Sequence, residues 1–137
     1  MIRPAMPIQG QTSWCLSTGR HQDGERNKIA LKECSANGIL RELFRFDKKG
    51  RLRSLRYKSY CVEPMDSTTE FSPLQMKKCS TSKTSWLLDS RGHFLANGSK
   101  AAFSVSTIEG EGKIPFVSSL MEENAHVIQE WQLIRSD

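Results

Sequence analysis

Long apolar stretches are missing from this sequence of 137 residues. Since it holds no run of about 18 apolar residues, we expect no membrane span. The opening residues Met1-Ile2-Arg3-Pro4 also lack the apolar core of a secretory signal peptide. The chain is therefore either cytoplasmic or a secreted protein whose leader is not in the sequence.

Aromatic residues are scarce too, at 8% against 37% apolar residues in all, so a core must be built from many small contributions. Three histidines, His21, His93 and His126, stand far apart, and no Gly-x-Ser-x-Gly sequence, metal-ligand pair or phosphate loop occurs. We therefore expect a chain that is not an enzyme and that holds neither a metal nor another cofactor.

Four cysteines allow two interpretations. Their spacing does not suit a structural zinc site, whereas their even number suits a disulfide framework. Cys15 and Cys34 are 19 residues apart, and Cys61 and Cys79 are 18 apart. We therefore expect the bridges Cys15–Cys34 and Cys61–Cys79 in a secreted or extracytoplasmic protein. The alternative is four buried thiols in a cytosolic protein.

Charge is unevenly distributed along the chain. Residues 1–100 hold 18 Lys and Arg against 9 Asp and Glu, whereas residues 101–137 hold 2 against 6. This pattern indicates one face that attracts anions.

One nine-residue pattern occurs twice, 42 residues apart, as aromatic-x-apolar-Asp-x-x-Gly-x-apolar. It covers residues 44–52 and 86–94, and Trp131-Gln132-Leu133 begins a third copy 45 residues later. The pattern predicts a β-hairpin, in which the aspartate binds the backbone of the turn and the glycine supplies a positive φ. Asp47 and Asp89 are thus explained as turn residues rather than as a catalytic carboxylate pair.

A second repeated element precedes the cysteines. Ile29-Ala30-Leu31 ends three residues before Cys34, Leu74-Gln75-Met76 ends three before Cys79, and Ile114-Pro115-Phe116 continues the series. Ala102 and Ser119 then stand where the cysteines of a third copy would be. We expect this copy to keep its strands and to lose the bridge.

Short strands and regular turns predict an all-β fold. Because no copy can bury its own apolar face, we expect a β-trefoil of three four-stranded repeats around a pseudo-threefold axis. Phe44, Trp86 and Trp131 should be buried at equivalent positions, beside Leu31, Met76 and Phe116. The predicted domain spans residues 8–137, with repeats at 8–55, 56–97 and 98–135. Residues 1–7 look like a linker or an artificial start and are assigned no structure.

The series Trp14-Cys15-Leu16, Leu31-Lys32-Glu33-Cys34, Phe44, Gly50-Arg51-Leu52-Arg53 and Cys61-Val62 resembles the repeats of ricin-B-type lectins. Their Gln-x-Trp signature is complete at Gln129-Glu130-Trp131, and the resemblance covers residues 8–135. It implies a β-trefoil that binds galactose-type sugars in shallow pockets, one in each repeat.

The resemblance also implies four clamp positions in each pocket. An Asp two residues after the first cysteine binds sugar hydroxyls, and an aromatic residue two before the second cysteine stacks on the sugar. An Asn three residues before the tryptophan completes the clamp, sometimes with the Gln that follows it. By register these positions are Ser17, Lys32, Arg41 and Glu42, then Glu63, Lys77, Lys83 and Thr84, then Ser104, Val117, Ile128 and Gln129. No repeat keeps the Asp, the aromatic residue or the Asn, so we expect lactose to bind worse than about 1 mM.

Cations replace neutral clamp residues in the two bridged repeats. Lys32 and Lys77 stand at the aromatic positions and Arg41 and Lys83 at the Asn positions, while Glu63 imitates the Asp with a longer side chain. One interpretation is recognition of sulfated or sialylated glycans through charge-assisted hydrogen bonds. The cysteine-rich domains of mannose-receptor-like proteins, which bind sulfated sugars, resemble this case. The other interpretation is that unused pockets drift toward ordinary surface residues.

A basic run forms a second candidate site, with Tyr57 and Tyr60 as stacking residues. Its seven cations are Arg45, Lys48, Lys49, Arg51, Arg53, Arg56 and Lys58. The alternation Arg51-Leu52-Arg53 is equally typical of a strand with one solvated face. Nucleic acid is not expected as a partner in an oxidising compartment. Asn97-Gly98-Ser99 matches a glycosylation sequon, which has meaning only in a eukaryotic secretory route.

We therefore expect a secreted β-trefoil that recognises glycans or glycoproteins. One alternative is a trefoil without sugar binding that serves as a protein–protein or receptor-binding subunit, beside a partner subunit or a further domain. Subunits of some bacterial toxins resemble ricin-B trefoils of this kind. A second alternative is a basic trefoil that binds heparin-like polyanions, which should weaken steeply with ionic strength.

Overall fold

Short β-strands make up nearly all of the regular structure, as the repeats predicted. The computed structural model describes residues 1–5, 14–18, 28–35, 40–66, 70–97, 99, 101–107, 114–121 and 126–134. Within these residues lies one short 3-10 helix, η2 (Leu40–Glu42). The strands are β1 (Ile2–Pro4), β2 (Trp14–Thr18), β3 (Ile29–Glu33), β4 (Phe44–Phe46), β5 (Leu52–Ser54), β6 (Tyr60–Pro64), β7 (Ser72–Lys78), β8 (Trp86–Leu88), β9 (Phe94–Ala96), β10 (Ala101–Ser106), β11 (Phe116–Ser119), β12 (Val127–Ile128) and β13 (Trp131–Leu133).

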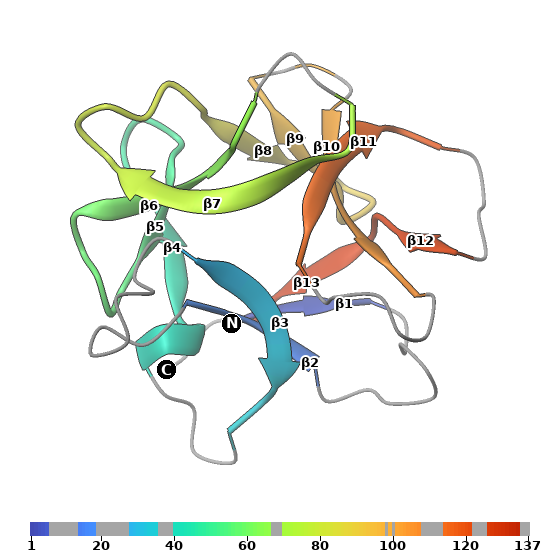
Figure 1. Ribbon diagram of the computed structural model, residues 1–137, viewed down its shortest axis with the longest axis horizontal. Coiled ribbons are helices and arrows are strands. Elements are labelled where there is room, and N and C mark those ends of the chain that lie inside the picture. The colour runs from blue at the N-terminus through green and yellow to red at the C-terminus, as the bar shows by residue number, and fades with distance from the viewer. Residues whose placement is uncertain are drawn as a thin grey trace.

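The strands form one large curled sheet and two strand pairs. The large sheet has the order β4-β5-β6-β7-β11-β10-β9-β8, with β12 paired to β10. β2 pairs with β3, and β1 with β13, all antiparallel. In Figure 1 the equivalent strands β3, β7 and β11 lie around a common centre. This is the arrangement that three repeats around one axis require.

Two hairpins carry the repeated Asp and Gly. The aspartates are Asp47 in the first hairpin and Asp89 in the second. In each hairpin the Oδ1 atom of the aspartate accepts hydrogen bonds, all of 2.9 Å, from the backbone N–H groups two and four residues later. Gly50 and Gly92 have φ of 77° and 88°, values that L side chains rarely adopt. The predicted role of the two aspartates as turn residues is confirmed.

Each of these turns is bonded to the next repeat. The carbonyl of Gly50 accepts the backbone N–H of Trp86, and the carbonyl of Gly92 accepts that of Trp131, both at 2.8 Å. The hairpin of one repeat thereby fixes the aromatic residue that opens the hairpin of the following repeat.

The three aromatic residues that open the repeated pattern are buried, with exposed fractions of 5% for Phe44, 4% for Trp86 and 3% for Trp131. The indole Nε1 of Trp86 donates to the carbonyl of Val62 at 2.9 Å, and that of Trp131 donates to the carbonyl of Phe103 at 2.8 Å. The ring of Phe103 also lies against both indoles in the core. The predicted equivalence of these positions is confirmed.

The register of the third repeat differs from the prediction by one residue. Leu31 and Met76 lie opposite the residue that follows the first cysteine of their repeat. In the third repeat that residue is Phe103, and its partner is Val117, which is buried, whereas Phe116 is half-buried. The prediction of Phe116 was wrong because, without a cysteine, nothing in the local sequence fixes the strand against a one-residue slip.

The same shift moves one position of the missing bridge. Ala102 lies opposite Ser118, as Cys15 lies opposite Lys32. Counting two residues onward, the counterpart of the second cysteine is Leu120 and not Ser119. The prediction of Ala102 as the counterpart of the first cysteine agrees with this register.

The first residues of the chain are structured, contrary to expectation. Ile2, Arg3 and Pro4 form β1 and pair with Leu133, Gln132 and Trp131 of β13. Ile2 is fully buried in the core. No periodic pattern marks this strand because three residues are too few to show one, and β13 supplies its partner strand.

Both predicted disulfides are present. Cys15 is bridged to Cys34 and Cys61 to Cys79, with Cα–Cα distances of 5.1 and 5.0 Å. Each bridge ties the outgoing and returning strands of one long hairpin, β2–β3 or β6–β7. Within the residues that the structure describes, no helix is both long and apolar enough to cross a membrane.

Candidate functional site

At two of the four clamp positions of the first repeat, the side chain is already hydrogen-bonded to a neighbouring residue. Ser17 on β2 is buried and donates its hydroxyl to the carbonyl of Thr18 at 3.2 Å. Glu42 on η2 is only 2% exposed, and its carboxylate accepts the N–H of Ser35 at 3.0 and 3.2 Å and the Ser35 hydroxyl at 3.1 Å. Glu42 therefore ties η2 to the end of β3 instead of facing a ligand.

The two cations of the first pocket are more accessible. Lys32 is exposed on β3 directly opposite Cys15, and Arg41 on η2 is partly exposed. Among the described residues, neither forms an ion pair. These two side chains are available for an anion.

In the second pocket the residues that replace the Asp and the aromatic residue bind each other. Glu63 on β6 is buried, and its Oε1 lies 3.4 Å from Nζ of Lys77 on β7, which is half exposed. Thr84 is buried and Lys83 is exposed in the segment before β8. The charge of Lys77 is thus partly neutralised, which leaves Lys83 as the more open cation here.

A buried hydrogen-bond network occupies the clamp positions of the third repeat. Nε2 of Gln129 lies 3.1 Å from the hydroxyl of Ser104, 3.0 Å from that of Ser118 and 3.0 Å from the carbonyl of Ser119. The two hydroxyls are 3.0 Å apart, and Oε1 of Gln129 accepts the N–H of Met121 at 2.9 Å. Gln129 therefore supports the fold in this repeat.

Two residues assigned to the third pocket belong to the core. Val117 and Ile128 are 4% and 5% exposed and pack in the main apolar cluster. With the corrected register, Ser118 stands at the stacking position. No repeat has an aromatic side chain there.

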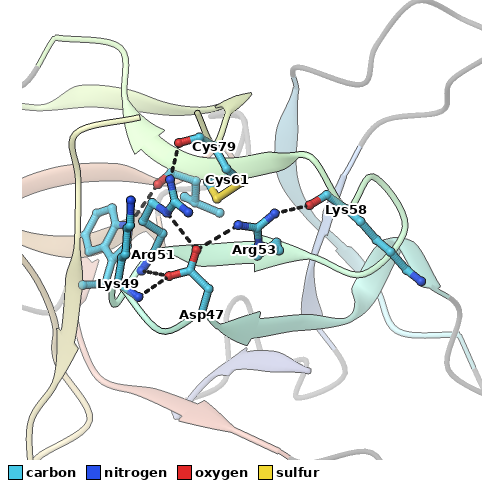
Figure 2. Close-up of polar contacts among 9 residues, drawn as sticks. Asp47, Lys49, Arg51, Arg53, Lys58, Cys61 and Cys79 are labelled. Atoms are coloured by element: carbon cyan, nitrogen blue, oxygen red, sulfur yellow. Dashed lines mark hydrogen bonds and ion pairs between the residues drawn. A yellow bond between two sulfur atoms is a disulfide. The ribbon is translucent and has the colours of Figure 1, made fainter. Parts of the chain in front are cut away.

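One carboxylate, that of Asp47, forms ion pairs with two of the seven cations of the basic run. Figure 2 shows Asp47 between Arg51 and Arg53, with Nε of Arg51 at 2.7 Å and Nη2 of Arg53 at 3.0 Å from Oδ2. The other arms of the guanidinium groups donate to backbone carbonyls, Arg51 to Cys79 and Arg53 to Lys58. Arg51 and Arg53, predicted as a basic face, instead join the hairpin to the backbone just before β6, at Lys58, and just after β7, at Cys79.

These contacts stabilise the ionised form of Asp47. Partial burial acts to raise its pKa, but the hydrogen bonds from the backbone and side chain of Arg51, from Arg53 and from the backbone of Lys49 outweigh it. The net result is a pKa of about 2. Asp47 therefore stays ionised across the physiological range and keeps both guanidinium groups in place.

Five cations of the run are left on the surface, namely Arg45, Lys48, Lys49, Arg56 and Lys58. Arg56 lies over the ring of Tyr57, 4.8 Å from its centroid. Tyr57 is only 8% exposed, so it cannot stack on a ligand as expected, and Tyr60 is half-buried on β6. The run therefore presents charge with little aromatic surface.

His93 occupies in the second hairpin the place that Arg51 has in the first. Its Nδ1 lies 2.9 Å from Oδ2 of Asp89, and its side chain is buried. Burial acts to raise the pKa of Asp89, but hydrogen bonds from His93 and the backbone of Arg91 bring it below its ordinary value. This pair closes a turn. His126 is exposed, and His21 lies outside the described residues.

Sequence reasoning missed Ser35 as the partner of Glu42 and Ser118 as a partner of Gln129. A buried carboxylate needs donors close by, so the polar residue that follows Cys34 was the one signal that could have identified Ser35. Ser118 was masked by the register error.

Known proteins resemble this chain over nearly its whole length. The family model described as the ricin-type beta-trefoil lectin domain matches residues 4–131. The agglutinin from Abrus precatorius is similar with a TM-score of 0.70 and 15% identity, over 96% of this chain and 46% of its own. A non-toxic homologue of type II RIPs from Momordica charantia (bitter gourd), solved in complex with α-methyl-D-galactoside, is similar with a TM-score of 0.68 and 16% identity. This match covers 96% of the present chain and 47% of the homologue's chain. No curated protein sequence matches the chain.

At these identities the solved structures establish a shared fold, and the predicted β-trefoil is confirmed. This chain spans about half the length of the two chains that it resembles.

Proposed function

The chain belongs to the family of ricin-type β-trefoil lectin domains, and from this premise we propose that it is a secreted module that binds anionic glycans, sulfated or sialylated. The family match supports carbohydrate binding in general by a module that is not itself catalytic. The choice of anionic glycans rests on the cations at the clamp positions.

The observation that carries the proposal is the exposed Lys32 at the stacking position of the first repeat, with Arg41 at the Asn position. An ammonium and a guanidinium cannot stack as a tryptophan does on the C–H face of galactose, but both donate strong hydrogen bonds to sulfate or carboxylate oxygens. The second repeat is the weaker site because Glu63 already binds Lys77.

Secretion is supported by the two disulfides. Such bridges persist in oxidising compartments and are rare where glutathione keeps thiols reduced. The ligands of such a module are the glycans and glycoproteins found outside the cytosol.

The test compares sialyllactose and galactose-4-sulfate with lactose, by titration calorimetry at low and high ionic strength. Lactose should bind worse than about 1 mM. The anionic sugars should bind more tightly, and Lys32→Ala should weaken them roughly tenfold or more through the loss of a charge-assisted bond. Lys77→Ala should weaken the binding of anionic sugars less than Lys32→Ala does. The control is Lys78→Ala, which removes an exposed lysine from the next position of β7.

Tight lactose binding would contradict the proposal. So would anionic-sugar binding that is indifferent to Lys32→Ala, because the site would then lie elsewhere. Binding of heparin lost on mutation of Arg45 and Lys49 would favour the alternative of polyanion recognition on the basic run.

A second candidate function is that of a protein–protein or receptor-binding subunit. It is favoured by the internal bonding at Glu63 and Gln129, which removes clamp groups from two of the three pockets. A chain that binds no glycan of either charge class at any ionic strength would support this alternative.

A further inference from the structure

An apolar corner lies where β6 ends and where β7 and β11 begin. Across the described residues, the large apolar side chains with more than half their surface exposed include Met65 at 61%, Phe71 at 57% and Ile114 at 52%, all at this corner. Such a concentration on a soluble domain is typical of a contact surface.

Strand pairing places the apolar residues of this corner in one row. The N–H of Met65 donates to the carbonyl of Pro73 at 2.8 Å, and Pro73 lies opposite Phe116 in the β7–β11 pair. Residues paired in this way have side chains on the same face of a sheet. The ring of Phe71 packs beside that row, 5.8 Å from the ring of Phe116 at an interplanar angle of 55°.

The backbone of Phe71 is strained. Its φ is +62°, a value that is unusual for a bulky L residue. Contacts on both sides hold it there: the carboxylate of Glu70 accepts the N–H of Ser119 at 2.7 Å and its hydroxyl at 3.0 Å. The hydroxyl of Ser72 accepts the N–H of Asp66 at 2.8 Å. Strain of this kind, kept while the ring faces solvent, is often part of a binding site.

We propose that Phe71, backed by Phe116, is a carbohydrate-stacking platform that takes the apolar C–H face of a neutral pyranose, outside the three pockets of the repeats. The inference rests on the proposed carbohydrate-binding function. The stacking positions inside the pockets are Lys32, Lys77 and Ser118, so a ring that can stack on a sugar must come from elsewhere in the chain.

Two features select a neutral sugar for this platform. The hydrogen bonds of Glu70 and Ser72 hold the backbone on either side of Phe71, and less ordering on binding favours a small rigid ligand. The carboxylate of the adjacent Glu70 uses two acceptor sites on Ser119 and keeps others for sugar hydroxyls, while its charge repels sulfate and carboxylate groups.

The experiment is saturation-transfer NMR with three probes, methyl α-D-galactoside, methyl β-D-glucoside and methyl β-D-xyloside. Phe71→Gly should lower affinity for the probe that binds best by roughly fivefold or more. Because glycine adopts the positive φ without strain, this variant should keep or raise its unfolding temperature. Phe71→Trp should retain binding. Leu87→Ala is the control, since Leu87 is 58% exposed on β8 and lies outside the corner.

Neutral-sugar binding that is lost in Phe71→Gly and kept in the tryptophan and control variants would support the platform. Neutral-sugar binding unchanged in Phe71→Gly would overturn it. A protein that binds sialyllactose but none of the three probes would also overturn it, while leaving the proposed function intact. A protein that binds neither the anionic nor the neutral sugars would overturn both the proposed function and the platform. A dimer in sedimentation experiments that Phe71→Gly converts to a monomer would identify the corner as a protein interface and overturn the inference.

Discussion

Replacing Gly92 by alanine should destabilise the protein far more than the same change at Gly50, although both glycines occupy the same place in their hairpins. Both have a positive φ, so alanine at either position should cost about 1 to 2 kcal/mol in backbone strain. At Gly50 the added Cβ would lie 3.4 Å from the Cβ of Ser85 and 3.9 Å, an ordinary contact distance, from the carbonyl oxygen of Trp86. The Ser85 side chain can give way by a small shift.

At Gly92 the added Cβ would lie 2.7 Å from the carbonyl oxygen of Trp131 and 3.3 Å from its nitrogen. These are backbone atoms, and the Trp131 N–H donates to the Gly92 carbonyl at 2.8 Å. Relief of the clash must therefore separate that bond, which is worth about 1 kcal/mol, and shift β13 against the core. We expect a total loss of about 3 kcal/mol or more.

The assay is equilibrium urea unfolding of oxidised protein, followed by tryptophan fluorescence, for the wild type and both variants. The midpoint should fall modestly for Gly50→Ala and steeply for Gly92→Ala, with similar slopes. Losses that agree within about 0.5 kcal/mol would refute the reasoning, because they would show that the two turns are equally free to relax.

Two further predictions concern polar side chains that are buried or partly buried. Acidification should remove about 1 to 2 kcal/mol of stability through Asp47, allowing for solvent screening, since its pKa is about 2 when folded against an ordinary 3.8. This stabilisation is present above the ordinary value and is lost as the pH falls through 3.8 toward 2, so the unfolding free energies of wild type and Asp47→Asn should converge there; a constant difference would contradict it. Gln129→Ala should lower the free energy of unfolding by about 2 to 3 kcal/mol, since it removes the acceptor of the Met121 N–H and the donor shared by two buried hydroxyls and the Ser119 carbonyl. The exposed Gln132→Ala is its control, and an equally small thermal shift in both variants would mean that water replaces the amide.

The hairpins, the disulfides and the trefoil could be predicted because each depends on local spacing. The Asp and Gly of a turn act within four residues of one another, and two nearly equal cysteine spacings, of 19 and 18 residues, identify the bridges. The repeat of these local signals then required three units around one axis. Residues 2–4 were missed because their partner strand is at the other end of the sequence.

The contents of the pockets could be predicted only in part. The sequence shows which residue stands at each clamp position, but not whether its side chain turns toward a ligand or toward a neighbour. Glu42 stands at the Gln position and Glu63 at the Asp position, yet Glu42 is bound to Ser35 and Glu63 to Lys77. Such choices depend on distances between segments, and periodicity carries no information about those distances. For the same reason Arg51 and Arg53 looked like a free basic face.

The hydrogen bonds from each hairpin to the following repeat have a consequence for how the molecule folds. A lone repeat would leave the carbonyl of Gly50 or Gly92 and the backbone N–H of Trp86 or Trp131 without their partners. The pairing of β1 with β13 then connects the two ends of the sequence, a contact that forms only after the whole chain has been gathered. The three repeats should therefore acquire and lose their structure together, in a single cooperative step, and none can be opened by a ligand or a protease while the other two stay closed.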